Sequence, residues 1–320
     1  MKIARSSAAS DTGRKRRRNE DAYVCQPPLF AVADGMGGAQ AGEIASRLAA
    51  GTVKGDEVEG SGESRVVELI QEANRRVHQR SMEDPNASGM GTTLTLALVE
   101  DGIVSIGHVG DSRAYLVRDG QLEQLTEDHS LVAELMRSGK LSAEEAESHP
   151  QRSVITRALG TDPDVDVDTF AVEPKVGDLF LLCSDGLTSM VEDDAILDVV
   201  ERHRSDLERL IRALIQAANK GGGEDNITVV AFEIAEGAEA DAEETVVTPP
   251  PAQRDPDDED TLTELDKVPA VDTVVIAPEE VERWNEERGR RSALGRVLLF
   301  LLLAFIVAVA IAAALWGLSQ

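Results

Sequence analysis

Two Asp-Gly pairs, Asp101-Gly102 and Asp119-Gly120, each follow a run of residues with alternating apolar character. Glycine accepts the positive φ angle that tight hairpin turns require, so each pair predicts a β-hairpin. Consecutive hairpins indicate an antiparallel sheet and disfavour the strand–helix–strand order of a parallel sheet. The central part of the chain is therefore expected to form antiparallel strands.

Strands and helices are both expected within residues 1–235. Apolar runs with strand character predict strands over Leu29–Ala33, Thr92–Val99, Ile103–Val109, Arg113–Val117, Leu179–Cys183 and Ile227–Ile234. Apolar residues at three- and four-residue spacing predict helices over Ala41–Val53, Arg65–Met82, Ser130–Ser138 and Asp206–Asn219. Hairpins and helices in this order indicate an α+β layered domain, and the absence of a repeat of twenty to fifty residues excludes a solenoid.

The segment 236–296 has a different composition. Between Glu236 and Glu282 it contains sixteen acidic residues, two basic ones and six of the twelve prolines. Such a stretch cannot bury enough apolar surface to fold alone, so it is expected to be a disordered linker with a basic end. Three of its threonines, Thr245, Thr261 and Thr273, directly follow an acidic residue.

The segment 297–318 is apolar for 22 positions without a charged residue. That length spans a hydrocarbon core, so the segment predicts a C-terminal transmembrane helix. Several arginines precede it, and the positive-inside rule then places the folded domain in the cytoplasm. No signal peptide is expected, because residues 1–18 are basic and lack an apolar core. The resulting expectation is a single-pass protein of the cell membrane with a cytoplasmic catalytic domain.

Charge and cysteine content limit the possible functions. The formal net charge is −27, which disfavours binding to nucleic acid. Cys25 and Cys183 lie in or beside apolar runs, and both are expected to be free thiols packed as small hydrophobic residues.

Four short acidic clusters lie where predicted strands begin or end: Asn19-Glu20-Asp21, Asp34-Gly35-Met36-Gly37-Gly38, Ser184-Asp185-Gly186 and Asp225-Asn226. Carboxylates delivered from several strand ends can converge into one set of hard oxygen ligands for divalent cations. Glycine after the aspartate allows the backbone to turn and offer its own carbonyl. An ordinary Asp-Gly turn is the simpler alternative for each pair, but the flanking apolar strands favour ligand roles.

Six motifs together resemble a known family. Arg16-x-x-Asn19-Glu20-Asp21, Asp34-Gly35-Met36-Gly37-Gly38, Gly91-Thr92-Thr93, Gly110-Asp111-Ser112-Arg113, Ser184-Asp185-Gly186 and Gly223-x-Asp225-Asn226 occur in the order of the bacterial metal-dependent protein serine/threonine phosphatases of the protein phosphatase 2C type. The resemblance covers about residues 4–235. It implies a four-layer α-β-β-α sandwich of two antiparallel sheets, with a metal centre at one edge.

The resemblance also implies roles for individual residues. Asp34 is expected to bridge two Mn²⁺ or Mg²⁺ ions. Asp185 and Asp225 would complete the ligands of one ion, and the Gly35 carbonyl with Glu20 would hold the other. Asp21 would orient the bound waters. Arg16 is expected to bind the phosphate, although it belongs to the basic run 14–18 and could equally be part of a solvated arm.

A third, weaker metal site is implied as well, with Asp111 as its main ligand, Asp185 reaching across and Ser153 joining from the segment after 131–148. The alternative for Asp111 is a turn-capping role. Eukaryotic members carry a histidine as candidate general acid that this chain lacks. His129 is a candidate replacement, but a structural hydrogen-bonding role is the favoured interpretation.

The expected reaction is hydrolysis of phosphoserine or phosphothreonine in proteins by a water activated between two divalent ions. The expected partners are phosphorylated proteins, including Ser/Thr kinases and their substrates, and the membrane. One alternative is a catalytically inactive binding module, which the intact set of carboxylates disfavours because their mutual repulsion is costly without cations. Another is a membrane scaffold whose acidic linker binds partners, which is compatible with the enzyme.

Overall fold

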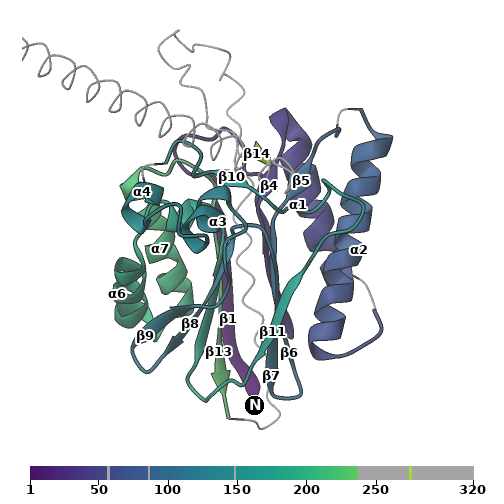
Figure 1. The fold of residues 1–320 in the computed structure, drawn as a ribbon. Helices are drawn as coiled ribbons and strands as arrows, with labels where there is room; N and C mark the ends of the chain where they lie inside the picture. Colours follow the sequence, from purple (N-terminus) through teal and green to yellow (C-terminus); the bar gives the residue numbers. More distant parts are fainter. Residues whose placement is uncertain (56–57, 86, 148, 237–273, 276–320) are drawn as a thin grey trace, which may run out of the picture. The chain divides into compact units, whose positions relative to one another are not determined.

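The structure is a computed structural model that describes residues 1–55, 58–85, 87–147, 149–236 and 274–275. Two five-stranded antiparallel sheets form its centre (Figure 1). The first sheet has the order β1 (Lys2–Asp11), β13 (Ile227–Ala235), β12 (Leu179–Cys183), β8 (Arg113–Arg118) and β9 (Gln121–Gln124). The second has the order β11 (Asp168–Val172), β7 (Ile103–Val109), β6 (Leu94–Glu100), β3 (Leu29–Ala33) and β2 (Ala22–Gln26). The predicted antiparallel sheets are confirmed.

Helices cover the outer face of each sheet. In Figure 1, α1 (Gly38–Gly55) and α2 (Gly62–Glu83) lie beside the second sheet, and α6 (Asp193–His203) and α7 (Leu207–Gly221) lie beside the first. The short α5 (Asp185–Thr188) follows β12. Two further helices, α3 (Leu131–Arg137) and α4 (Ala143–Glu147), follow β9 in the chain and stand at one end of the sandwich. The four layers expected from the resemblance are therefore present.

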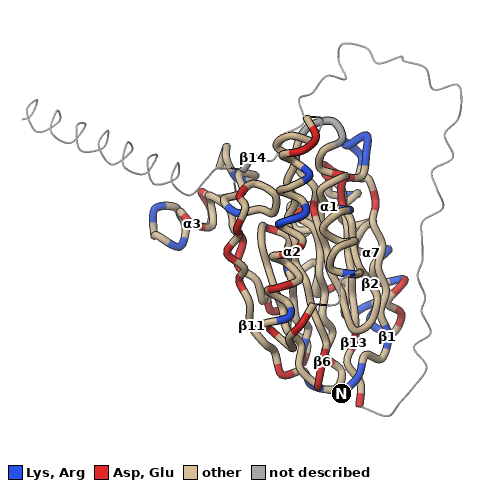
Figure 2. Tube along the Cα trace, turned by 90° about the vertical axis from the view of Figure 1, so that its right-hand side faces the viewer, with Lys and Arg blue, Asp and Glu red and all other residues tan. Residues whose placement is uncertain are grey.

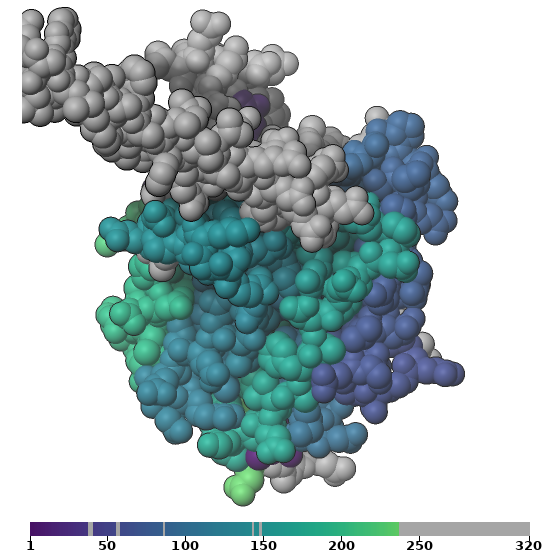
Figure 3. Space-filling view, viewed as in Figure 1, coloured from purple at the N-terminus to yellow at the C-terminus, as the bar shows by residue number. Residues whose placement is uncertain are grey.

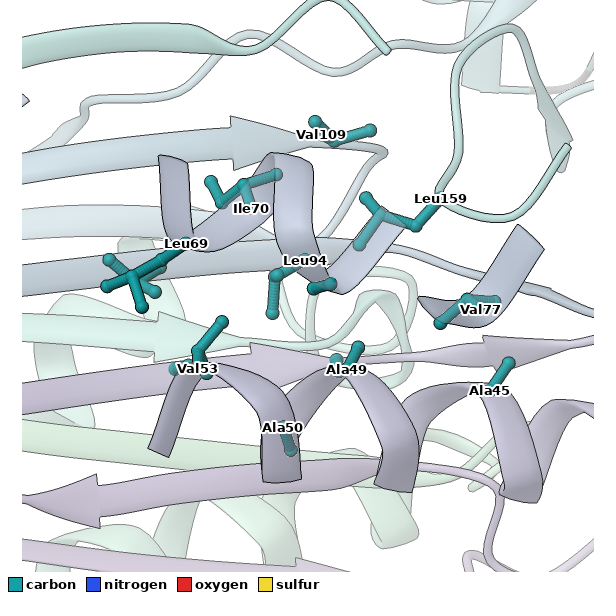
Figure 4. Packing of buried hydrophobic residues seen from close by; sticks show 14 of the residues in the cluster. Ala45, Ala49, Ala50, Val53, Leu69, Ile70, Val77, Leu94, Val109 and Leu159 are labelled. Atoms are coloured by element: carbon teal, nitrogen blue, oxygen red, sulfur yellow. The ribbon is translucent and has the colours of Figure 1, made fainter. Parts of the chain in front are cut away.

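Three apolar cores hold these layers together. Between the sheets, the Phe232 ring stacks against Phe30 and Phe180 with centroid distances of 4.1 and 5.0 Å. On one outer side, the small residues Ala45 and Ala49 of α1 allow this helix to pack closely against α2 and the second sheet (Figure 4). Burying a large apolar side chain contributes roughly 1.5–3 kcal/mol each, so these cores account for much of the stability.

Both predicted hairpins are present. Asp101 and Gly102 have φ angles of 50° and 78° between β6 and β7, and Asp119 and Gly120 have 52° and 75° between β8 and β9. Two consecutive positive φ angles define the primed turn that matches strand twist. The turns place β6, β7, β8 and β9 in the register that the alternating apolar pattern requires.

Two short strand pairs lie at one end of the sandwich. Strand β4 (Gly35–Met36) pairs with β5 (Gly91–Thr92), and β10 (Val154–Ile155) pairs in parallel with β14 (Val274–Val275). In Figure 3, teal atoms of α3 and α4 and green-teal atoms of the segment that leads into β11 lie on the face turned to the viewer. Acidic and basic residues are interspersed over the elements of the described sandwich (Figure 2), so its charges do not form the continuous basic surface typical of nucleic-acid binding.

The transmembrane helix predicted over 297–318 requires correction. No helix in the described ranges is both long and apolar enough to cross a membrane. The longest of them, α2, has 22 residues but carries exposed ion pairs such as Arg75–Glu68 and Arg76–Glu72, which a hydrocarbon core would not accommodate. The predicted segment itself lies outside the described residues, as does the linker apart from Glu236 and β14. The single-pass membrane location depended on that helix and is corrected with it.

Candidate metal centre

The four acidic clusters meet at one end of the sandwich because of strand direction. Glu20 and Asp21 precede β2, and Asp34 follows β3, its antiparallel neighbour. Asp185 follows β12, and Asp225 precedes β13, again its antiparallel neighbour. In adjacent antiparallel strands, the end of one strand lies beside the start of the other. Each sheet therefore places two of the acidic clusters at the same end of its strands. The stacking of the sheets then brings the two pairs of clusters together.

Asp34 lies at the centre of this group. Its carboxyl group lies among those of Asp21, Asp185, Asp225 and Asp111, close enough for their charges to act on it. Burial, followed by the negative charges of Asp21, Asp185, Asp225 and Asp111, raises the pKa of Asp34 well above its usual range. A buried carboxyl group surrounded by several others is suited to bridge two cations, because each cation would relieve part of the mutual repulsion.

The neighbouring carboxyl groups show the same excess of negative charge. Burial and the charge of Asp225 raise the pKa of Asp185 to about 7. Burial raises the pKa of Asp21 to about 6, even though Thr228 and Ser184 hydroxyls donate to its Oδ2 at 2.5 and 2.8 Å. The Oδ1 atoms of both Asp21 and Asp185 are buried without a hydrogen-bond partner.

Unpartnered buried carboxylate oxygens fit a site for divalent cations. Hard cations prefer carboxylate oxygens, and Mg²⁺ in particular is held by one or two carboxylates together with several waters. No group of three or more His, Cys, Asp or Glu side chains in the described residues is already arranged as a ligand set. A centre in which water and a backbone carbonyl complete the coordination does not need such a group.

Arg16 is the basic residue that faces the cluster. Its guanidinium donates to Asp225 Oδ2 at 2.8 Å, with 24% of its side chain exposed. Burial opposes its charge, but Asp225, Asp34 and Asp185 together raise the pKa of Arg16 above its usual value. The other members of the basic run, 14, 15, 17 and 18, are exposed. Arg16 is thus the member of this run that is paired with a carboxylate of the cluster, and its role in binding phosphate stays a prediction.

Close backbone contacts at two glycines bring the clusters together. A Cβ atom on Gly35 would lie 2.1 Å from the Gly42 carbonyl oxygen of α1 and 2.5 Å from the Glu20 carbonyl oxygen. A Cβ atom on Gly186 would lie 2.0 Å from the Asn226 carbonyl oxygen. Any side chain at these positions would push apart the loops that carry Asp34 and Glu20, or Asp185 and Asp225. Glycine is therefore required for approach between loops.

Several residues that position the clusters had no role in the sequence analysis. Asn226 accepts from the Glu20 N–H at 2.8 Å and donates to the carbonyls of Thr12 and Arg18 at 2.9 Å each. This amide ties both ends of the loop before Glu20 to the start of β13. Its place in the Asp225-Asn226 motif was visible in the sequence, but its partners more than two hundred residues away were not.

The threonines of the Gly91-Thr92-Thr93 motif position the backbone of Asp34. The Thr93 hydroxyl accepts from the Asp34 N–H at 3.0 Å and contacts the Ser112 hydroxyl at 2.8 Å. The Thr92 hydroxyl donates to the Asp34 carbonyl at 2.8 Å. The backbone of Asp34 is thus fixed by β5, and the same contacts connect it to the loop that carries Asp111.

Asp111 lies next to the main cluster. It is buried, and burial together with the charge of Asp185 raises its pKa well above the usual range. Its proximity to Asp185 agrees with the pair expected at a third site. Ser153 directly precedes β10 and is half-buried, and its part in that site stays a prediction.

His129 is held as a structural residue. Its ring Nδ1 accepts from the Gly110 N–H at 3.0 Å, and its Nε2 lies 3.0 Å from Asp168 Oδ2. Because Nδ1 accepts, the ring proton resides on Nε2 and is donated to Asp168. Arg157 completes the group by donating to Asp168 Oδ1 at 2.6 Å. His129 is buried, with 4% exposed, so the hydrogen-bonding interpretation is favoured over a general acid.

Known proteins with similar sequences are named as phosphatases. The serine/threonine phosphatase stp of Listeria welshimeri is 42% identical over 236 residues, which cover 70% of this chain and 93% of that protein. The serine/threonine protein phosphatase PstP of Mycobacterium tuberculosis is 40% identical over 235 residues, covering 72% of this chain and 45% of PstP.

Solved structures agree with these sequences. The crystal structure of the M. tuberculosis phosphatase PstP/Ppp is 39% identical, with a TM-score of 0.69, and covers 73% of this chain and all of that one. A PstP catalytic domain in complex with two manganese ions has a TM-score of 0.66 at 35% identity and covers 74% of this chain. The family described as protein phosphatase 2C matches residues 13–227. The resemblance carried by the six motifs is confirmed, and the chain belongs to the protein phosphatase 2C family.

Proposed function

We propose that this chain hydrolyses phosphoserine and phosphothreonine in proteins, with Mn²⁺ or Mg²⁺ held by the carboxylate cluster. The observation that carries the proposal is the buried position of Asp34 among several other carboxyl groups, beside carboxylate oxygens of Asp21 and Asp185 that have no hydrogen-bond partner. The relatives named as serine/threonine phosphatases, and the similar structure with two manganese ions, support the same reaction and cofactor.

The proposed ligand roles are those implied by the resemblance of the motifs to the family. Asp34 would bridge two ions, Asp185 and Asp225 would complete one, and the Gly35 carbonyl and Glu20 would hold the other. The ions, when bound, supply Lewis-acid polarisation of the phosphoryl group and lower the pKa of a coordinated water. Asp21 would accept hydrogen bonds from the waters around them, because Ser184 and Thr228 fix its Oδ2 and leave Oδ1 open.

Arg16 would bind and orient the phosphoryl oxygens. Its planar guanidinium offers several parallel donors, which match phosphate better than an ammonium group does. In the described structure one of these donors is paired with Asp225. Cation binding at Asp225 would compete for that carboxylate and free the guanidinium for the substrate. Asp111, with Asp185 and Ser153, would form a third, weaker cation site beside the first two.

The substrates define the partner class. Phosphoserine and phosphothreonine esters in proteins are formed by Ser/Thr kinases, so the enzyme would oppose one or more of these kinases. Kinases that are themselves phosphorylated on serine or threonine belong to the same substrate class.

An Asp34→Asn variant tests this function against a matched control. Asp119→Asn changes the same residue type in an Asp-Gly pair that forms a hairpin turn, at the opposite end of β8 from Asp111. Mn²⁺-dependent hydrolysis of p-nitrophenyl phosphate and of a phosphothreonine peptide is expected in the parent and in Asp119→Asn, and its loss in Asp34→Asn. Equal turnover and equal Mn²⁺ stoichiometry by calorimetry in both variants would refute the assignment.

A further inference from the structure

The two edges of β10 are used differently. On one edge, Ile155 forms a bridge with Ser130, and the Thr156 N–H donates to the His129 carbonyl at 2.8 Å. On the other edge, β10 pairs in parallel with β14, with Val154 opposite Val274 and Ile155 opposite Val275. The first edge attaches β10 to the catalytic domain. The second edge is filled by a segment that follows the domain by nearly forty positions in the sequence.

Strand β10 lies beside the metal centre. Ile155 packs with Met36 and Ala158, and Met36 belongs to β4, directly after Asp34-Gly35. Leu159 forms a bridge with Thr92 of β5, the partner of β4. In Figure 1, β14, β10, β4 and β5 all lie at the same end of the sandwich. Strand β10 therefore lies beside the loop that carries the proposed bridging carboxylate, and a strand paired with its outer edge lies at the same end of the sandwich.

The sequence of the occupant suits strand addition. Within the acidic segment, residues 268–277 read Val-Pro-Ala-Val-Asp-Thr-Val-Val-Ile-Ala and concentrate β-branched apolar residues. Such residues favour the extended conformation. Strand addition uses mainly main-chain donors and acceptors, so it can accept many different peptides of the same shape.

We propose that the outer edge of β10 is a docking strand that binds the main chain of an extended phosphoprotein segment beside the metal centre. The chain's own segment at Val274–Val275 is its resident occupant and competes with substrate for this edge. The inference rests on the proposed function, since competition has a meaning only if the centre processes phosphoproteins. It adds to that function the mode of substrate binding and an internal control of access.

The strength of such a contact agrees with reversible competition. A pair of two residues contributes few main-chain hydrogen bonds, so a free peptide of this length would bind weakly. A segment on the same chain is present at an effective concentration of the order of millimolar, which compensates for weak pairing. A substrate that presents a longer extended segment can displace it.

The chain offers a matched pair of variants for the test. Thr273-Val274-Val275 follows Asp272, and Thr245-Val246-Val247 follows Glu244, so the same tripeptide occurs twice after an acidic residue. Replacing both valines by proline at 274 and 275 removes two N–H donors and prevents strand pairing there. The same double replacement at 246 and 247 serves as the control. Both changes are made in the full chain.

Two measurements are compared in the parent and the two variants. Hydrogen–deuterium exchange of the peptide covering 150–158 reports the pairing directly and does not depend on activity. The KM for an extended phosphothreonine peptide reports competition, and the KM for p-nitrophenyl phosphate, which has no peptide chain to dock, provides the reference.

The 274/275 variant is expected to exchange faster over 150–158 and to have an at least threefold lower KM for the peptide. A threefold change in KM corresponds to a parent in which β14 occupies the edge about two thirds of the time. Its KM for p-nitrophenyl phosphate is expected to equal that of the parent. The control variant is expected to match the parent both in exchange over 150–158 and in KM for the peptide. For a phosphopeptide with N-methylated backbone amides, the KM of the 274/275 variant is expected to equal that of the parent.

Unchanged exchange over 150–158 would overturn the docking of β14. Faster exchange with an unchanged peptide KM would overturn competition for substrate. An equal effect of the 246/247 replacement would overturn the assignment to Val274–Val275. Absence of Mn²⁺-dependent p-nitrophenyl phosphate hydrolysis in the parent would refute the proposed function instead, and the exchange experiment would still decide whether β14 occupies the edge.

Discussion

Two polar clusters at the same end of the sandwich differ in how well their charges are balanced. The cluster of His129, Asp168 and Arg157 pairs a carboxylate with a guanidinium and an imidazole, and each ring nitrogen of His129 has a partner. The cluster around Asp34 gathers several carboxyl groups against Arg16, and two of its buried oxygens have no partner. Balanced polar clusters stabilise a fold, whereas an unbalanced cluster lowers stability unless a ligand completes it.

The largest expected effect separates activity from stability in the Asp34 cluster. An Asp185→Asn variant should lose Mn²⁺-dependent turnover by more than ~100-fold, because even residues that only support metal ligands typically cost 10–100-fold. Its metal-free form should unfold at or above the parent's temperature, since one repelling charge is removed. Phosphatase assays and thermal unfolding in chelator measure the two quantities. A large loss of metal-free stability would break the comparison.

In the balanced cluster of His129, Asp168 and Arg157, a substitution is expected to lower stability while Mn²⁺ binding is retained. His129→Ala should lower the free energy of unfolding by about 1–3 kcal/mol, because the buried Gly110 N–H loses its acceptor. Calorimetry should still detect the two tighter Mn²⁺ ions in the folded protein. Denaturant unfolding and Mn²⁺ titration of the same sample test this. Loss of both ions with unchanged stability would mean that His129 belongs functionally to the Asp34 cluster.

Asp111 sharpens the comparison because it is close to Asp185 and directly follows Gly110, whose N–H donates to His129. Asp111→Ala should lower turnover by about tenfold, equivalent to ~1.4 kcal/mol, while KM for substrate changes less. Two Mn²⁺ ions should remain tightly bound and a third should weaken. The measurement is turnover across a range of Mn²⁺ concentrations. A variant as active as the parent at every concentration would remove the third site.

The smallest expected effect is a pH dependence of metal-free stability. Folding raises the pKa of Asp21 from 3.8 to about 6 and that of Asp185 from 3.8 to about 7. The folded protein then binds more protons than the unfolded one, so this contribution is complete below about pH 4 and is lost as the pH rises to 7.

Mn²⁺ binds the ionised carboxylates, so its affinity should change in the opposite direction. The gap between the unfolding temperatures with Mn²⁺ and with chelator should widen from pH 5.5 to 7.5. A gap that stays constant over this range would show that proton release from this cluster is not coupled to metal binding.

The sequence was sufficient to predict strands that consist of an uninterrupted or alternating run of apolar residues. The strands β3, β7 and β12 were predicted with the bounds that the structure has, because each is an uninterrupted or alternating apolar run. Strand β1 was not predicted, since its ten residues are dominated by Ser and Ala. Its conformation results from pairing with β13 over its whole length, which is an interaction across the full domain.

The site was identified from the sequence only in part. The aspartates could be selected because glycines and apolar strands flank them. Only its place three residues before Asn19 selected Arg16 from its basic neighbours, and its pairing with Asp225 could not be foreseen because it joins residues more than two hundred positions apart. The roles of Thr93 and Asn226 depend on contacts between distant loops. Apolar length alone led to the transmembrane prediction, which the described helices do not support.

The link that Asn226 makes between the two ends of the domain has a consequence for synthesis on the ribosome. Strand β1 finds its partner β13, and the loop before Glu20 finds its anchor, only after more than two hundred further residues have been made. At about 5–20 residues per second this interval lasts roughly 10–40 s. During that time the loops that carry Glu20 and Asp34 are present without the loop that carries Asp225, so the unfinished chain has an incomplete carboxylate cluster and cannot act as a phosphatase. The onset of activity is therefore timed by the emergence of β13.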